Sequence, residues 1–219
     1  MSSTFRWRSW ETAGIGLLCG VLVLCAAFKW IPASLVDAFA FATGIVCVWL
    51  ITKESIWNWP WGLVNNLLIA VINWQNRLFA DFGLQWVYFA MGLWGWWEWL
   101  HGGRGRTPLP VSSTTRREWF GLAIFLLLGT WGLWELMLHV NGAAPFADSV
   151  VTAICLAAQY LICRKRIENW YFWITADLIY IPLYWSRGVP MLSALFTVFL
   201  CLCILGLIRW RRELQAQAA

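Results

Sequence analysis

The stretch NWYFWITADLIYIPLYW, residues 169–185, contains a single charged side chain, Asp177. A helix needs about 20 mostly apolar residues to cross a bilayer, and about 17 suffice. Lipid offers the backbone no hydrogen-bond partner, so runs of this length must be helical. Seven further runs of this kind predict an all-α integral membrane bundle of eight transmembrane helices, at residues 10–28, 35–51, 59–75, 82–100, 118–139, 147–163, 168–185 and 190–210.

The composition of the chain points the same way. Of its 219 residues, 61% are hydrophobic and only 12% are charged, whereas soluble domains hold about a quarter charged residues. The net charge of +5 comes from short clusters between the apolar runs, so no nucleic-acid partner is expected. Alternate connections, counted from the N-terminus, hold thirteen Lys and Arg residues against three on the opposite side. This bias predicts that both termini are cytoplasmic.

The chain matches itself when it is shifted by 111 residues. The shift needs no gap, and it superposes three pairs of tryptophans and one Asn-Trp dipeptide, which are unlikely to match by chance. The matched pairs include Asp37 and Asp148, Asn58 and Asn169, Trp59 and Trp170, Trp74 and Trp185, Gly95 and Gly206, and Trp99 and Trp210. We therefore predict an internal duplication.

The duplication predicts how the chain is divided. Two three-helix repeats, residues 35–100 and 147–210, flank a basic linker and one connecting helix within residues 101–146. Residues 1–34 add an extra N-terminal helix, and residues 211–219 form a tail. One helix between the copies returns the chain to its starting side, so the repeats should run parallel in a 3+1+3 arrangement. Parallel repeats build transporters whose substrate lies near the membrane midplane; the alternative is a duplicated scaffold without a pathway.

Polar side chains occur at the middle of two predicted helices, where lipid makes them costly. Asn65 and Asn66 lie at the midpoint of residues 59–75, and the 111-residue shift places Asn66 on Asp177. An amide and a carboxylate at equivalent depths suit a neutral or cationic polar solute. The alternative is an Asn–Asp hydrogen bond that holds helices together.

Aromatic residues accompany this carboxylate. Trp173, Asp177, Tyr180 and Tyr184 have the spacing of one helix face, and Trp61 lies on the equivalent helix of the first repeat. Aromatic rings beside a carboxylate suit a planar cationic heterocycle. Other tryptophans lie near the ends of the apolar runs, and we assign them mainly to the membrane interfaces: Trp57, Trp94, Trp96, Trp97, Trp99 and Trp210.

The remaining polar and thiol groups indicate no catalysis. Gln85 and Gln159 can add hydrogen bonds, Gln159 chiefly to helix packing, and Glu98 can reach the basic linker. Glu135 and His139 suggest either proton coupling or, as we expect, a solvated pair. The sequence has no hydrolase, metalloprotease or P-loop motif and no zinc-ligand spacing among its seven cysteines. We expect no enzyme activity, no metal and no cofactor.

Several short motifs lie along the two repeats: NWPWGLVN at residues 58–65, LFAD at 78–81, Leu84-Gln85, GWWEW at 95–99, and RKRIENW at 164–170 with Trp173 and Asp177. Together these segments resemble the PnuC family of bacterial vitamin-precursor transporters. The resemblance covers residues 35–210. It implies a bundle with the architecture of full-length SWEET sugar transporters but a different connectivity, assembled as a homotrimer in the bacterial inner membrane.

The resemblance also implies a function. It implies uptake of nicotinamide riboside by facilitated diffusion, with trapping by a cytoplasmic kinase that phosphorylates the substrate for NAD synthesis. By match to the family pattern, the leading substrate-binding residues are Asn65, Gln85, Asn169, Trp173 and Asp177; further candidates are Asn66, Trp61, Tyr180 and Tyr184. Thiamine and riboflavin are alternative substrates within the family. A membrane-embedded structural or receptor subunit is an alternative outside transport.

Overall fold

Eight helices form from the eight apolar runs. The structure, a computed structural model, describes residues 9–139 and 145–218. Within these residues the helices are α1 (Ser9–Ala27), α2 (Leu35–Thr52), α3 (Asn58–Gln75), α4 (Phe79–His101), α5 (Arg116–His139), α6 (Pro145–Cys163), α7 (Asn169–Ser186) and α8 (Pro190–Ala218). The predicted all-α class with eight helices is confirmed, and the described residues contain no strand beyond one isolated bridge between Ser112 and Arg166.

The helix ends follow the 111-residue shift. The bounds of α3, Asn58–Gln75, become those of α7, Asn169–Ser186, and the first residue of α4 becomes that of α8. The turns before α3 and α7 place Glu54 and Lys165 at positive φ, 55° and 51°. Residues other than glycine rarely adopt positive φ, so its recurrence at matched positions indicates that the two turns have the same backbone conformation. The relative orientation of the two repeats stays a prediction.

Hydropathy separates the helices into two groups. α1, α2, α5, α6 and α8 are long and apolar enough to cross a membrane. α3, α4 and α7 have 18, 23 and 18 residues, but polar side chains such as Asn65, Gln85 and Asp177 lower their mean hydropathy. The helices with the weakest apolar signal are therefore those that carry the candidate site residues.

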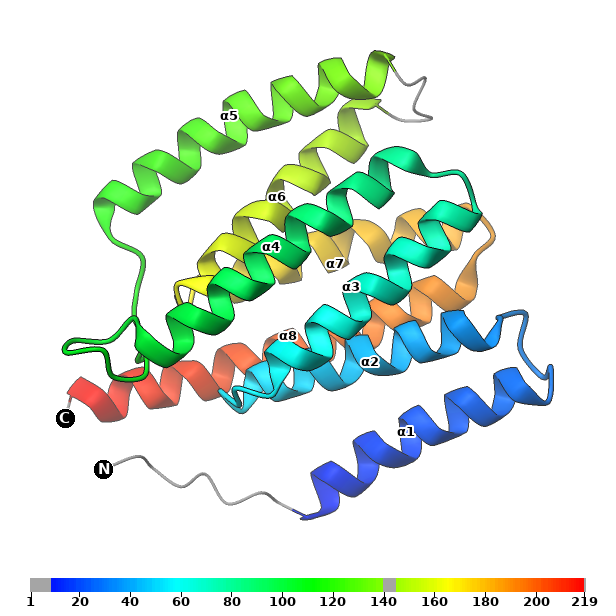
Figure 1. The fold of residues 1–219 in the computed structure, drawn as a ribbon, viewed down its shortest axis with the longest axis horizontal. Coiled ribbons are helices and arrows are strands. Elements are labelled where there is room, and N and C mark those ends of the chain that lie inside the picture. Colours follow the sequence, from blue (N-terminus) through cyan, green and yellow to red (C-terminus); the bar gives the residue numbers. More distant parts are fainter. Residues whose placement is uncertain (1–8, 140–144, 219) are drawn as a thin grey trace. The chain divides into compact units, whose positions relative to one another are not determined.

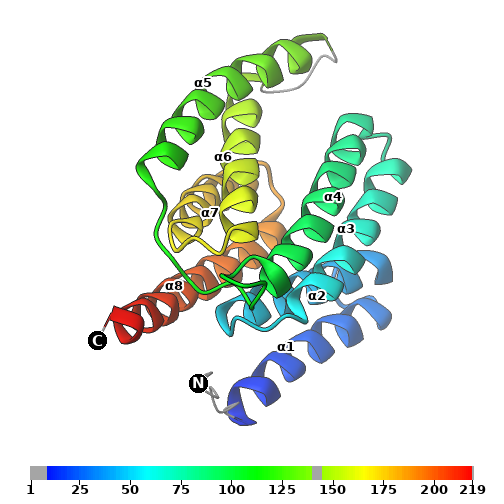
Figure 2. The same cartoon turned by 60° about the vertical axis from the view of Figure 1, so that its left-hand side comes forward.

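The chain forms two compact units, residues 1–93 and 94–219, and the division falls within α4. In the first unit, α1 packs on α2, and α2 packs on α3 (Figure 1). In the second unit, α6 packs between α5 and α7, and α7 also packs on α8 (Figure 2).

Buried tryptophans fill one end of the second unit. Trp170 and Trp210 are 1% and 0% exposed, and their rings meet edge to face at 5.3 Å. A Cβ at residue 206 would lie 2.4 Å from the Trp170 ring, so this contact requires Gly206. Trp99 is 3% exposed and donates its Nε1–H to the carbonyl of Ile162 at 2.9 Å.

Two of the interface assignments made from the sequence are therefore wrong. Trp99 and Trp210 are core residues, because their rings pack on other helices instead of facing lipid headgroups. Trp57 and Trp97, which are 64% and 57% exposed, retain the exposure that an interface role requires.

Candidate functional site

α7 presents two opposite faces. Its exposed face consists of Tyr171, Thr175, Leu178, Pro182 and Trp185. The other face, called here the α7 site face, consists of Trp173, Asp177, Tyr180 and Tyr184, which are buried or half-buried. At about 100° per residue the two sets lie on opposite sides of the helix. The structure thus brings four of the predicted site residues together and turns them away from the exposed side.

Asp177 is the buried acidic group of this face. It is 3% exposed. One of its carboxyl oxygens, Oδ2, has no hydrogen-bond partner within residues 9–139 and 145–218. A buried carboxylate oxygen without a donor is costly. A ligand that brings a positive charge or a hydroxyl group to Oδ2 would remove that cost.

Flat aromatic surfaces continue the α7 site face along the helix. The Tyr180 and Tyr184 rings stack at 5.7 Å, and Phe196 of α8 lies 4.7 Å from Tyr180 and 5.4 Å from Tyr184. The Tyr184 and Phe196 planes differ by only 4°. Stacked rings of this kind can receive another planar ring.

Asn65 has a structural partner in the first unit. Its Nδ2 donates to the carbonyl of Ala40 at 2.6 Å and to Oγ1 of Thr43 at 3.0 Å. These bonds join α3 to α2, so helix packing uses the amide N–H groups of Asn65. On the same unit, Asn66 and Gln85 are half-buried, while Trp61 is 43% exposed. Contact of these four residues with a substrate stays a prediction.

Asn169 stabilises the turn that begins α7. It is fully buried, and its Nδ2 donates to the carbonyl of Arg166 at 2.6 Å. Asn58 makes the equivalent bond to Ser55 at 2.7 Å before α3. Asn169 precedes Asp177 by eight residues, which is about 12 Å along a helix. A substrate contact of Asn169 would therefore lie two turns away from the carboxyl group.

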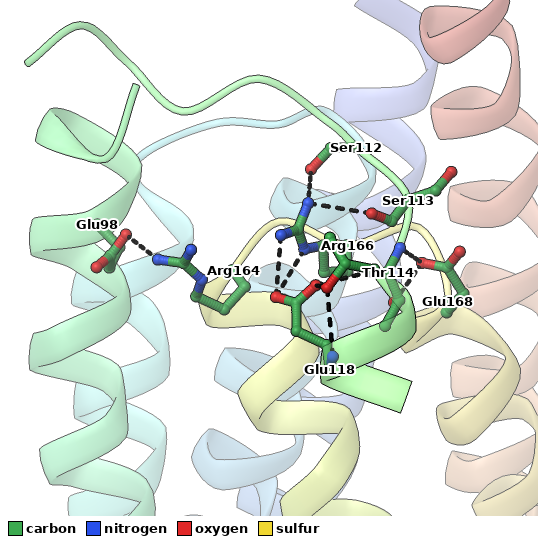
Figure 3. Close-up of polar contacts among 9 residues, drawn as sticks. Glu98, Ser112, Ser113, Thr114, Glu118, Arg164, Arg166 and Glu168 are labelled. Carbon is green, nitrogen blue, oxygen red and sulfur yellow. Dashed lines mark hydrogen bonds and ion pairs between the residues drawn. The ribbon is translucent and has the colours of Figure 1, made fainter. Parts of the chain in front are cut away.

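The turn between α6 and α7 is bound to the linker before α5, an arrangement that the sequence did not predict (Figure 3). Arg166 donates to Glu118 Oε1 from Nε at 3.2 Å and from Nη2 at 2.9 Å. Its Nη1 donates to Ser112 Oγ at 2.6 Å and to the Ser113 carbonyl at 3.1 Å. This guanidinium thus fixes the linker against the turn.

Other side chains of the same turn extend this contact. Glu168 accepts hydrogen bonds from the backbone N–H and the hydroxyl of Thr114, at 2.9 and 2.7 Å. Arg164 pairs with Glu98 at 2.9 Å, so Glu98 bonds this turn, whereas the sequence indicated the basic linker. We call these bonds between residues 98–118 and residues 164–168 the linker contact. It holds the first residues of α7 in place.

The other polar candidates have local partners. Nε2 of Gln159 lies 4.0 Å from Cys163 Sγ in the same helix. His139 Nδ1 lies 2.7 Å from the carbonyl of Glu135, also within one helix. In the part of the chain that the structure describes, no three His, Cys, Asp or Glu side chains gather as a metal site.

Comparisons with known proteins identify the fold and the family. The family model described as nicotinamide mononucleotide transporter matches residues 34–212. The nicotinamide riboside transporter PnuC of Neisseria mucosa is 26% identical, over 94% of this chain and 82% of the relative. PnuC of Escherichia coli is 24% identical, over 81% of this chain and 85% of the relative.

A more distant relative has another substrate in its name, and one solved structure shares the fold. The riboflavin/roseoflavin transporter RibM of Streptomyces davaonensis is 23% identical over 76% of this chain and 80% of the relative. The crystal structure of the vitamin B3 transporter PnuC superposes with a TM-score of 0.76 at 24% identity, and the match covers 96% of this chain and 94% of that one. The family match extends over most of the residues that form the eight helices, and its members are transporters, so this chain belongs to the nicotinamide mononucleotide transporter family, the PnuC family of membrane transporters.

Proposed function

We propose that the protein carries nicotinamide riboside into the cell by facilitated diffusion. The observation that supports this most directly is the α7 site face, where the unpartnered Oδ2 of Asp177 lies on the same helix side as stacked tyrosines. Nicotinamide riboside has a planar cationic ring and a ribose with hydroxyl groups. Its ring can stack on the aromatic side chains, and its positive charge can approach the carboxylate.

The acidic group also bears on which nicotinamide compound is carried. The mononucleotide differs from the riboside by a phosphate, which is repelled by a carboxylate in a medium of low dielectric constant. Asp177 therefore favours the riboside over the mononucleotide that gives the family its name. Phosphorylation by a cytoplasmic kinase would then trap the substrate, because the product carries the disfavoured group.

The transport movement follows from the predicted repeats. We place both termini and the basic turns in the cytoplasm, with the chain in the bacterial inner membrane as a homotrimer. Rocking of one three-helix repeat against the other would expose the substrate alternately to the two sides. Asn65, Asn66, Gln85 and Trp61 are the first-repeat residues proposed to meet the substrate, and Asn169 is proposed to act near the inner end.

Uptake into proteoliposomes tests this proposal. Purified protein should equilibrate labelled nicotinamide riboside down its gradient, and collapse of a proton gradient should leave the rate unchanged. Asp177→Asn should raise the KM about 10- to 100-fold, the loss expected for a hydrogen bond to a charged group. Leu178→Ala, on the exposed face beside it, is the matched control. An unchanged KM in Asp177→Asn would mean that the carboxylate serves helix packing and not substrate binding. Loss of uptake when the proton gradient is collapsed would mean that transport is coupled to protons, with Glu135 and His139 as the candidate coupling groups.

The second candidate substrate is another vitamin carried within this transporter family. The name of the relative RibM favours riboflavin as that substrate. A competition panel of nicotinamide riboside, thiamine and riboflavin separates the choices. Thiamine is cationic, so Asp177→Asn should weaken it as well, whereas neutral riboflavin should be indifferent to that change. Binding of a ligand without flux would instead favour a receptor or structural subunit.

A further inference from the structure

Four arginines of the second unit pair with no carboxylate in the described residues. Arg116 and Arg117 begin α5, and Arg211 and Arg212 lie in the last two turns of α8; all four are exposed. Only Arg211 makes a side-chain hydrogen bond within this part of the chain. By contrast, the two arginines of the linker contact each pair with a glutamate. The four exposed charges are therefore available to a ligand.

The first turn of α7 connects the two pairs of arginines. The hydroxyl of Tyr171 accepts a hydrogen bond from Nη2 of Arg211 at 3.4 Å. The ring of the next residue, Phe172, lies 6.2 Å from the ring of Trp119 in the first turn of α5. The start of α5 and the end of α8 thus both lie beside the start of α7, at the same end of the second unit (Figure 2). We call these residues the arginine patch: Arg116, Arg117, Trp119, Tyr171, Arg211 and Arg212.

Apolar side chains continue from the arginine patch along the same helices. On α8, Ile204, Ile208 and Arg211 have i, i+4, i+7 spacing and are all exposed, so one stripe of the helix changes from apolar to basic. On α5, Arg117 is followed by Phe120, which is 71% exposed. In a membrane protein such apolar stripes contact acyl chains, and arginines at their ends reach the headgroups. The surface therefore has the two chemical parts of a phospholipid site.

The guanidinium groups select the lipid by its charge. A guanidinium donates N–H groups in one plane, which suits two oxygens of a phosphate. Tyr171 uses only Nη2 of Arg211, so Nε and Nη1 have no partner within residues 9–139 and 145–218 and can donate to a phosphate. The ammonium group of a zwitterionic lipid cancels the phosphate charge. An anionic lipid retains its charge, so clustered arginines attract it more strongly.

We propose that the arginine patch binds a phospholipid with a net negative headgroup, such as phosphatidylglycerol. The phosphate contacts Arg211 and Arg212, and the acyl chains lie along the apolar residues beside them. Tyr171 holds the guanidinium of Arg211 toward the lipid. The proposal does not depend on which vitamin the protein carries, because the arginine patch lies outside the α7 site face.

Native mass spectrometry of the purified protein in a neutral detergent tests this assignment. The wild type should bind phosphatidylglycerol at least tenfold more tightly than phosphatidylcholine with the same acyl chains. Arg211→Gln combined with Arg212→Gln should raise the apparent Kd for phosphatidylglycerol about tenfold, because each arginine near the membrane surface strengthens the attraction several-fold. Arg187→Gln is the matched control. Arg187 is exposed in the same unit but follows the opposite end of α7, so the Kd should not change.

Two further variants examine the rest of the arginine patch. Arg116→Gln combined with Arg117→Gln should raise the Kd for phosphatidylglycerol three- to tenfold. Tyr171→Phe removes only the hydroxyl that holds Arg211 and should raise it two- to threefold. All of these side chains are exposed, so the melting temperature should stay within error of the wild type. Added salt should weaken the binding of phosphatidylglycerol and leave that of phosphatidylcholine unchanged.

Three results would overturn the assignment. Equal affinities for phosphatidylglycerol and phosphatidylcholine would mean that the surface does not respond to headgroup charge. An equal loss of affinity in Arg187→Gln and in the patch variants would mean that only the net charge of the protein matters. Patch variants that keep their affinity for phosphatidylglycerol but change the mass of the assembled protein would mean that another copy of the chain covers these arginines.

Discussion

The turns before α3 and α7 have the same backbone and different side-chain partners. Ser55 N donates to the Leu50 carbonyl at 3.0 Å, and Arg166 N donates to the Leu161 carbonyl at 2.8 Å. A buried asparagine closes each turn, Asn58 in one and Asn169 in the other. The residue at positive φ changes from an acid to a base between the turns, so its side-chain charge does not determine the turn.

The contacts of these turns outside the repeats differ. Lys53, which the shift matches to Arg164, pairs with Glu11 of α1. Arg164 pairs with Glu98, and the rest of its turn is held by the linker contact. The backbone of each turn is therefore set within its own repeat. A segment outside the two repeats then attaches to each turn at matched positions: α1 to the first turn, and the linker, residues 102–115, to the second.

The largest effect is expected at Arg166, because its loss leaves Glu118 without its cation. Both side chains are only 14% exposed. Breaking such a pair should cost about 2–4 kcal/mol of stability, a little below the value for fully buried pairs. Arg166→Met should therefore melt well below the wild type in a thermal-shift assay in detergent. Arg117→Met, at an exposed position, is the control, and equal melting of the two variants would mean that the linker contact adds no stability.

A second effect is expected at Gly206, which receives the buried tryptophan that follows the turn asparagine. An alanine Cβ would lie 2.4 Å from the Trp170 ring, and overpacking of this kind costs about 1–3 kcal/mol. Gly206→Ala should lower the melting temperature accordingly. Gly121→Ala has open space around its Cβ and should not; a stable Gly206→Ala would show that the ring can move aside.

Sequence patterns predicted the positions of the helices better than the side-chain contacts between them. Run length gives the helix bounds to within three residues except at the end of α8, which continues to Ala218 through most of the predicted tail instead of ending at residue 210. The spacing of Trp173, Asp177 and Tyr180 gives the α7 site face, because it depends only on local helix geometry. The pairing of Arg166 with Glu118 joins residues 48 apart, and the bond of Asn65 to Ala40 depends on how α3 is rotated against α2. No periodicity contains that information.

The tryptophans also show that sequence position does not determine burial. A tryptophan near the end of an apolar run fits a membrane interface and a buried core equally well. Trp210 lies in the core because Trp99 and Trp170 both pack against it. The choice depends on tertiary neighbours that are distant in sequence.

A third, intermediate effect tests whether the two turns are equivalent. Asn58→Ala and Asn169→Ala each remove one side-chain bond that caps a buried turn, which should cost about 1–2 kcal/mol. If the backbone is set within each repeat, the two losses of stability should agree. The measurement is the denaturation midpoint of each variant. A much smaller loss for Asn169→Ala would show that the linker contact holds the second turn without its asparagine.

The smallest effect is expected for the attachment of α1. Lys53→Met and Glu11→Gln each break the ion pair between α1 and the first turn, while Lys53 also lies 5.7 Å above the Trp49 ring. The two side chains are 5% and 11% exposed, but Lys53 donates one hydrogen bond to Glu11 whereas Arg166 donates two to Glu118. We therefore expect a coupling energy of about 1 kcal/mol from the double-mutant cycle. The exchange Lys53→Glu with Glu11→Lys should recover most of the stability lost by either reversal alone. If the exchanged protein does not recover this stability, α1 is held by its apolar packing on α2 and not by the ion pair. In that case α1 and the linker would attach at matched positions but through different kinds of contact.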